Sequence, residues 1–425
     1  MVDVSFVVVC GCESVVVDFV EIYFAKCYTV MMLTTVKKSR IGFARETGPR
    51  FIIPTEVVHP LTRKITRVWN YQGKDDLFII LKEFVHKLYF KYLAVNPKDR
   101  RAVIVESVLC PTLFRNTLAE VLFMHFEIPS LIYVPSHLMA LFTVGISSAL
   151  VMDVGYSETI TLPIYAGVPI LSACENIPLG GQVIHRRIEA ELMEKATVKT
   201  SAPGERTLAE VLSELEEPLK ESVLEDIKVR TCFVTPRARG LILQAHEARK
   251  QIKGSVSPDP ELEVPPPPLD VNYPLDGEKT LTIPGTLREW AAEILFEQDA
   301  DNKSIATLIL DSLLRCPIDT RRELANNVII MGGTAMLPGF KHSLLTEVKM
   351  LLDDPRYSSR LPLKEIKIHN PPAKENYVAW LGASAFGGTE AVPSRSITRD
   401  QYRQTKYIPD WSDHKWAEDS GKSLS

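Results

Sequence analysis

One aspartate stands where a carboxylate could take part in phosphate or metal chemistry. Asp153 closes an apolar run at residues 149–152, and Val154 and Gly155 follow it. A carboxylate at the end of a strand, beside a tight glycine turn, can hold a hydrated Mg²⁺ ion next to a phosphate. The same pattern is equally typical of a plain strand end, so both interpretations stay open.

A glycine pair provides the second candidate. Gly332 and Gly333 follow the expected strand at 327–330 and precede Thr334 and a helical pattern that begins at Phe340. Two glycines let a ligand approach the backbone closely, and a strand-to-helix turn presents backbone N–H groups to it. The pattern predicts a phosphate- or nucleotide-binding turn; the alternative is a turn that only connects a strand to a helix.

Strands must position these residues, and the sequence contains the strand–aspartate pattern twice. Residues 14–19 form a short apolar run with Asp18 near its end, as residues 149–155 do with Asp153. Each run fits a buried strand with a carboxylate at its tip. The two aspartates lie 135 positions apart, which hints at an internal duplication.

Helices alternate with strands around these two units. Apolar residues from Leu81 to Leu93 recur at i, i+3, i+4 and i+7, which predicts an amphipathic helix. Further helices are expected at 112–126, 136–143, 181–195, 207–216, 222–232, 287–298, 304–315 and 340–352, and strands at 102–105, 131–134, 327–331 and 365–369. Such alternation favours α/β layers with a mainly parallel sheet.

Composition limits the class of protein. The chain has 425 residues, enough for two or three domains, with 45% hydrophobic and 24% charged residues, the usual globular balance. The net charge of −4 shows no basic excess, so neither nucleic acid nor an anionic membrane is expected as the main partner. Seven scattered cysteines argue against a disulfide framework. No apolar run approaches the length of a membrane span, so no membrane insertion is expected.

Residues 254–269 differ from the rest of the chain because they are rich in proline. Pro258 and Pro260 are followed by the run Pro265 to Pro268. A segment of this composition is expected to be a solvated loop. It could dock into the groove of an SH3 or WW domain, but an exposed spacer is the favoured interpretation.

Taken together, these segments resemble the actin family. Asp153-Val-Gly155 and residues 332–339 are similar to the second phosphate loop and the adenosine loop of that family. Further similar stretches are 42–54, 225–234, 316–322 and 380–384. The resemblance extends from Ser14 to about Trp411.

The resemblance implies an α/β, actin-like (duplicated RNase H-like) two-domain fold with a nucleotide cleft between the domains. Residues 1–136 and 364–425 would form the first domain, with a shortened arm at 55–80, and residues 137–363 the second. ATP or ADP with Mg²⁺, bound without turnover, is the implied cofactor, although an empty cleft is equally compatible. By family position the nucleotide-contacting residues would be Lys26, Asp153, Gly155, Lys228, Gly332, Gly333, Thr334 and Met336, with Asp153 facing the metal.

Departures from the family pattern argue against catalysis. The first phosphate loop of actins carries glycines, whereas residues 18–26 contain none, and Lys26 is one position further along than in the family. Ile160 replaces the histidine that orients the attacking water. Ser136 replaces the aligning glutamine, unless a one-residue gap places His137 there. Since hydrolysis needs a positioned water, no enzymatic activity is expected.

Other substitutions alter the nucleotide contacts themselves. Tyr156 and Ser157 replace an acidic residue and a glycine in the second loop, and Val229 replaces the acidic ribose contact beside Lys228. Side chains at positions that need bare backbone crowd a phosphate. Binding without turnover therefore rests on Asp153, Lys228 and residues Gly332 to Thr334.

Within the family, several stretches are similar to the actin-related proteins of dynactin, the cofactor of the dynein motor; they lie at 95–101, 106–110, 135–140, 273–279, 294–298 and 408–411. This implies a cytoplasmic, cytoskeletal subunit that caps the pointed end of the actin-like filament and contacts the other pointed-end subunits, with dynein and cargo adaptors as indirect partners. The alternatives are an ATPase or phosphotransferase of the same superfold and a chromatin-remodelling actin relative. The latter would carry long charged insertions that the sequence lacks.

One segment has no counterpart in the family. Cys27 and Gly42 are expected to be near neighbours across a strand pair, yet the 14 residues from Tyr28 to Ile41 intervene. An inserted loop and an error in the gene model are the two explanations. The same two explanations apply to residues 1–12.

Overall fold

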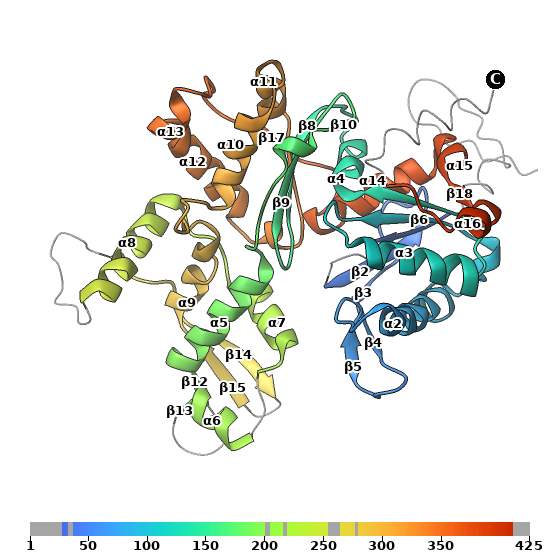
Figure 1. Ribbon diagram of the computed structural model, residues 1–425. Helices are drawn as coiled ribbons and strands as arrows, with labels where there is room; N and C mark the ends of the chain where they lie inside the picture. Colours follow the sequence, from blue (N-terminus) through green and yellow to red (C-terminus); the bar gives the residue numbers. More distant parts are fainter. Residues whose placement is uncertain are drawn as a thin grey trace, which may run out of the picture. The chain divides into compact units, whose positions relative to one another are not determined.

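A computed structural model describes residues 28–32, 37–199, 205–215, 219–253, 264–276 and 279–410 (Figure 1). The chain divides into two compact units: unit 1 holds the described residues up to Thr143 and from Ala379 onward, and unit 2 holds those from Val144 to Val378. The boundaries between these units lie later in the chain than the predicted domain boundaries, which follow residues 136 and 363. Helix α4 (Ser136–Phe142) stays within unit 1, and β17 (Ile368–His369) pairs with a strand of unit 2.

Unit 1 is built on one six-stranded sheet in the order β18-β7-β6-β1-β2-β3. Its strands are β1 (Tyr28–Met32), β2 (Lys38–Phe43), β3 (Phe51–Pro54), β6 (Arg101–Glu106), β7 (Ser130–Pro135) and β18 (Ile397–Thr398). β1 is central, antiparallel to β2 and parallel to β6, and β6 is parallel to β7. The sheet is therefore mixed, whereas the sequence favoured a mainly parallel one.

The expectation of an inserted loop between Cys27 and Gly42 is wrong for the described residues. Tyr28–Met32 forms the central strand, and Val30 pairs directly with Gly42. Val30 and Met31 are completely buried, and the indole N–H of Trp380 donates a hydrogen bond of 3.1 Å to the Val30 carbonyl. β-branched and apolar side chains suit a strand that is covered on both faces. Asp18 and the predicted strand at 14–19 lie outside the described residues.

Helices and a hairpin surround this sheet. The predicted helix at 81–93 is confirmed as the end of α2 (Lys74–His86) with a continuing π-helical segment, η1 (Lys87–Leu93). The other elements of unit 1 are the hairpin β4–β5 (Glu56–Val58, Ile65–Arg67), η2 (Pro97–Asp99), α3 (Thr112–Glu120), η3 (Val121–His125), α14 (Val378–Gly387), α15 (Ala391–Arg395) and α16 (Arg399–Thr405). The hairpin packs beside α2 (Figure 1).

Unit 2 contains two sheets. The first has the path β10-β9-β8-β16-β17, with β11 paired to β9, and its strands are β8 (Ala149–Val154), β9 (Thr159–Tyr165), β10 (Val168–Pro169), β11 (Glu175–Ile177), β16 (Val328–Met331) and β17. β8 lies between antiparallel β9 and parallel β16, the same neighbours that β1 has in unit 1. The second sheet is four-stranded: β13 (Glu205–Thr207), β12 (Thr197–Lys199), β15 (Lys279–Ile283) and β14 (Val271–Asp276).

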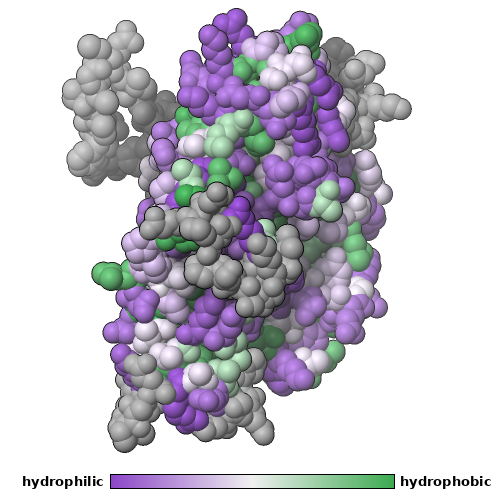
Figure 2. Space-filling model, turned by 90° about the vertical axis from the view of Figure 1, so that its left-hand side faces the viewer, coloured by the Kyte–Doolittle hydropathy of each residue, from purple (hydrophilic) through white to green (hydrophobic). Residues whose placement is uncertain are grey.

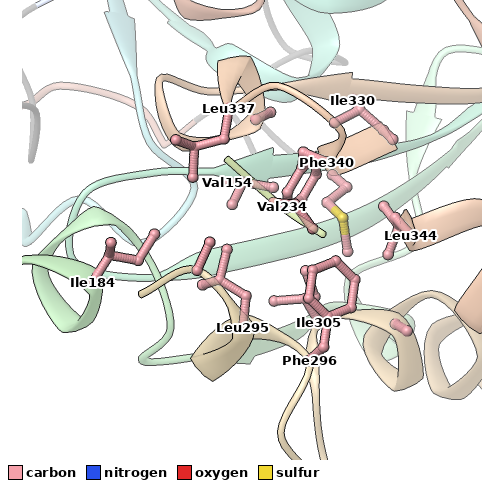
Figure 3. Close-up of a cluster of buried hydrophobic side chains, with 14 of the residues drawn as sticks. Val154, Ile184, Val234, Leu295, Phe296, Ile305, Ile330, Leu337, Phe340 and Leu344 are labelled. Atoms are coloured by element: carbon pink, nitrogen blue, oxygen red, sulfur yellow. The ribbon is translucent and has the colours of Figure 1, made fainter. Parts of the chain in front are cut away.

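The helices of unit 2 bury their apolar sides against the two sheets and one another. They are α5 (Gly181–Lys195), α6 (Leu208–Leu215), α7 (Glu221–Thr231), α8 (Arg237–Lys253), α9 (Gly285–Trp290), α10 (Ile305–Arg315), α11 (Ile318–Asn326), α12 (Phe340–Leu352) and α13 (Pro355–Ser358), with short turns η4 (Leu171–Ala173), η5 (Glu293–Leu295), η6 (Thr334–Met336) and η7 (Glu375–Tyr377). Figure 3 shows part of their core, where Phe296, Ile305 and Phe340 come together. Within the described ranges, no helix has the length and apolar character needed to cross a bilayer.

Candidate nucleotide site

The structure places Asp153 near the carboxyl end of β8, beside the glycine pair. In register, Asp153 pairs with Met331 on β16 and with Ile160 on β9. Parallel strands end at the same edge of a sheet, so the turns after β8 and β16 meet there. The turn after β8 is tight, because the Gly155 N–H donates to the Glu158 carbonyl at 3.0 Å.

Gly332 is required by the geometry of the turn after β16. Its φ is +104°, and a Cβ atom there would lie 2.2 Å from the Val154 carbonyl oxygen and 2.6 Å from Oδ1 of Asp153. Its N–H donates to the Glu375 carbonyl at 2.9 Å. Gly333 has an ordinary φ of −69° and open space around its Cα. The two glycines therefore have different roles. Gly332 lets the turn pack against β8, whereas Gly333 leaves open the space that a side chain would occupy.

We expect Gly332→Ala to disrupt this turn and Gly333→Ala to be tolerated. The added methyl at position 332 collides with backbone and takes an unfavourable φ, which is expected to cost about 1–3 kcal/mol of stability. Gly333→Ala adds the same group where nothing lies within 4 Å. Urea unfolding of the two variants measures the difference, and equal stabilities would contradict the assigned role of Gly332.

Thr334 and Gly155 are joined by a direct contact. The Thr334 hydroxyl, in turn η6, donates to the Gly155 carbonyl at 2.7 Å, and the Gly181 N–H donates to the same oxygen at 3.1 Å. A Cβ at Gly181 would lie 3.1 Å from both Thr334 Oγ1 and Lys228 Nζ. Five of the residues predicted from the sequence thus lie together around the start of α5: Asp153, Gly155, Lys228, Gly332 and Thr334. Sequence reasoning missed Gly181, although the pair Gly180-Gly181 before a helix was a usable signal.

The buried ammonium of Lys228 is neutralised by a network that the sequence analysis did not identify. Lys228 Nζ lies 3.0 Å from Oε2 of Glu225, and the same oxygen lies 3.1 Å from Nε2 of His185. The Tyr156 ring meets the His185 ring edge-on at 5.5 Å, and the Tyr156 hydroxyl donates to Glu221. Glu221, Glu225 and Lys228 share one face of α7 because helical neighbours are three or four residues apart.

The remaining predicted positions do not join this group or cannot be assessed. Met336 ends turn η6 with 41% of its surface exposed, and Val229 is 62% exposed on α7. Ile160 is buried opposite Asp153 and offers no polar group to a water molecule. Ser136 is buried in unit 1, with Oγ 3.3 Å from Nδ1 of His137. Lys26 lies outside the described residues.

These residues can accommodate an anionic ligand, but several backbone donors are already used. The N–H groups of Gly155, Gly181, Gln182 and Gly332 all donate to carbonyls within unit 2. At Gly333, nothing lies within 4 Å of the position that a side chain would take. In the described part of the chain, no three His, Cys, Asp or Glu side chains form a metal site. A Mg²⁺ ion here would therefore need the ligand's own oxygens in addition to Asp153.

The fold and this arrangement define a class of protein, and sequence comparison agrees with it. The family model for actin matches residues 78–407, and the chain belongs to the actin family. This confirms the expected actin-like fold. Actin-related protein 10 of Dictyostelium discoideum is 26% identical over 439 aligned residues, covering 88% of this chain and 86% of that protein. The nucleotide contacts and the predicted domain boundaries remain predictions.

Proposed function

We propose that this chain is a non-catalytic actin-related subunit that caps the pointed end of the actin-like filament of dynactin. The observation that carries the proposal is the short segment between β3 and α2. Only the hairpin β4–β5 lies between Pro54 and Lys74. A subunit without an extended arm offers nothing for a further protomer to bind, so growth of the filament stops. The similarity to Actin-related protein 10 supports the assignment to this branch of the family.

The hairpin is compact because His59 holds its loop. The Leu61 and Thr62 N–H groups lie 3.3 Å from Nδ1 of His59, and Nε2 of His59 lies 2.9 Å from Oδ1 of Asp76 on α2. Lys87 Nζ donates to the Glu56 carbonyl at 3.1 Å. These bonds tie the two ends of β4 to α2 and to η1, so the hairpin is held against the helical segment.

The exposed surface of the hairpin is apolar and basic. Val58, Leu61 and Ile65 are 56%, 76% and 71% exposed, and Arg63 and Lys64 lie exposed between them. Exposed apolar groups in one small element indicate a protein contact. The aromatic residues of the segment are less available for such a contact: Tyr71 packs against the core of unit 1, and Trp69 is half-buried.

This proposal gives the chain protein partners. They are the filament subunits of dynactin and its other pointed-end subunits, with dynein and cargo adaptors as indirect partners, in the cytoplasm and on the cytoskeleton. The net charge of −4 supports neither nucleic acid nor an anionic membrane as a main partner. Support for a protein-docking role comes from the hairpin surface and from the family.

The proposal includes the absence of catalysis. By resemblance, Ile160 and either Ser136 or His137 stand at the positions of the water-orienting groups of the family, and all three are buried. Phosphoryl transfer depends on positioning and charge stabilisation. ATP or ADP with Mg²⁺ is proposed as a bound, unhydrolysed ligand of Asp153, Lys228 and the turn at Gly332–Thr334, and the chain functions equally with none. The alternative, an ATPase or phosphotransferase of the same superfold, predicts steady phosphate release from purified chain.

The proposal predicts that a longer arm removes the cap. Replacing residues 56–72 with the arm of a filament-forming actin, and leaving α2 intact, is expected to let a further subunit add. The measurement is filament length in reconstituted dynactin by electron microscopy. Phosphate release is measured separately on the purified chain, where it is expected at the level of buffer. Unchanged filament length with the grafted arm would contradict capping by a missing interface.

The companion variant is Leu61→Asp with Ile65→Asp, which leaves the arm short. Buried apolar contacts at the centre of an interface contribute about 2 kcal/mol or more each, so co-purification of the pointed-end partners should fall at least thirtyfold. Leu109→Asp, at a 43% exposed leucine elsewhere in unit 1, is the matched control. Equal recovery of the partners from all three proteins would exclude the hairpin from the interface.

A further inference from the structure

The proline run of unit 2 is anchored at its backbone. Of the proline-rich segment, the structure describes residues 264–269. Nη2 of Arg239 donates to the Pro265 and Pro266 carbonyls at 3.2 and 3.0 Å, and Nη1 of Arg288 donates to the Leu269 carbonyl at 2.6 Å. Two arginines thus hold both ends of the run, whereas the sequence favoured an exposed spacer.

The carboxyl-terminal part of the run lies directly on the start of α9. A Cβ atom at Gly285 would lie 1.6 Å from the Pro268 carbonyl oxygen and 2.5 Å from its carbon. The Gly285 N–H donates to Oδ1 of Asp270 at 2.8 Å. Glycine is required here because the backbone of the run occupies the space that any side chain would fill.

The two arginines are themselves fixed. Arg239 forms a bidentate pair with Glu289, at 2.6 and 2.8 Å, and Glu289 is buried. Nε of Arg288 donates to the Thr231 carbonyl at 3.0 Å, and its guanidinium lies 5.7 Å from the centre of the Phe233 ring. Planar guanidinium groups that are held in this way provide rigid donors.

The side chains of the run face water. Pro265, Pro266 and Pro267 are exposed, and Leu269 is 86% exposed. Each of the three prolines precedes another proline, so each is restricted to the polyproline II region. On the face shown in Figure 2, coloured hydrophobic residues lie in small scattered groups among hydrophilic ones.

We propose that the clamped run, residues 264–269, is a docking site for a partner domain that binds a polyproline II helix in an aromatic-lined groove. Such grooves recognise the rings and ridges of an extended proline segment. Because the arginines already hold the backbone, little conformational entropy is lost on binding, which favours affinity. Glu261, Glu263 and Asp270 flank the run, so the groove is expected to carry a basic rim. This site is independent of the pointed-end proposal.

The test measures binding of the full chain to SH3, WW and EVH1 domains that include both acidic-rimmed and basic-rimmed grooves. Biolayer interferometry on the immobilised chain gives each Kd. We expect a basic-rimmed domain to bind, and Pro265→Ala with Pro267→Ala to weaken it at least tenfold. Pro372→Ala, at an exposed proline in a separate pair, is the matched control. No binding by any of the domains, or equal loss in the control, would overturn the proposal.

The role of the clamp is tested with a free peptide of residues 262–271 and with Arg239→Lys. Lysine retains the charge beside Glu289, but it lacks the planar fork that pairs with both Glu289 oxygens while still reaching the proline carbonyls. The chain is expected to bind about tenfold tighter than the peptide. This factor corresponds to about 1.4 kcal/mol, the free energy that the peptide spends on becoming ordered when it binds. Arg239→Lys should reduce binding toward the peptide value, while its thermal unfolding reports any loss of fold. Equal affinities of chain and peptide would show that the run is not pre-organised.

Discussion

Replacing Arg237 with methionine should destabilise unit 2 by about 3–5 kcal/mol, because the change leaves two buried carboxylates without their cation. Nη1 of Arg237 lies 3.1 Å from Oε2 of Glu293, and Nε donates to Glu347. Gln244 Nε2 donates to the same Glu293 oxygen at 3.2 Å. Glu293 and Glu347 are 1% and 5% exposed, so water cannot replace the guanidinium. Methionine retains much of the aliphatic volume of arginine, so the loss of stability measures the effect of removing the positive charge.

The control for this variant is Arg230→Ala in the same unit. Arg230 pairs with Asp226 at 2.8 Å, but its side chain is 65% exposed. Exposed ion pairs contribute about 0–1 kcal/mol, so this change is expected to be nearly neutral. Hydrogen exchange of unit 2 peptides separates the two cases. Similar protection in both variants would show that the Arg237 cluster does not stabilise the unit.

The same cluster makes stability depend on pH. Burial raises the pKa of Glu293 from 4.5 to about 7, and Arg237 offsets this only in part. Between these values the native state holds a proton that the unfolded state has lost, so the unfolding free energy falls as pH rises from about 4.5 to about 7. Glu293→Gln removes that titration. Burial also raises the pKa of Glu106 in unit 1 to about 7, so Glu106 adds the same pH dependence to the wild-type chain and to Glu293→Gln. The difference between the unfolding free energies of these two proteins therefore reports Glu293 alone.

Met31→Ala is expected to destabilise unit 1 by about 2–5 kcal/mol, the usual cost of truncating a large buried side chain. Met31 is completely buried in β1 and pairs with Ile41 on β2 and Ile104 on β6. If residues 28–41 formed an inserted loop, the same change would have almost no effect. The measurement is urea unfolding monitored by the fluorescence of Trp380, whose indole is bonded to the Val30 carbonyl. Because other tryptophans contribute to the signal, hydrogen exchange of unit 1 peptides accompanies it.

Met124→Ala is the matched substitution for this experiment. Met124 also belongs to unit 1, but it is 43% exposed at the end of η3. Surface truncations of this kind change stability by about 0.5 kcal/mol or less. A Met31 variant as stable as the Met124 variant would mean that Tyr28–Met32 is not the central strand.

Local periodicity in the sequence determined most of the elements. The helix from Leu81 to Leu93 and the helix at 340–352 follow the 3.6-residue repeat, and both are present. The strand that carries Asp153 was predicted from its apolar run, and residues 149–154 form β8. These predictions succeed because a helix or a buried strand is encoded by neighbours a few positions apart. The glycine pair was equally visible, since glycine marks backbone that must be unusual or closely approached.

Contacts between distant residues were decided only by the tertiary structure. Residues 28–32 form the central strand because β2 and β6 bury them from both sides, and β6 lies about seventy residues away in the chain. Lys228 pairs with Glu225, a helical neighbour, but the start of α5 at Gly181 approaches it from another element. The cluster at Arg237 and the arginines under the proline run likewise join α8, α9 and α12 with the segments beside them. Periodicity records which face of an element is buried, but the identity of the side chain opposite depends on how the whole chain packs.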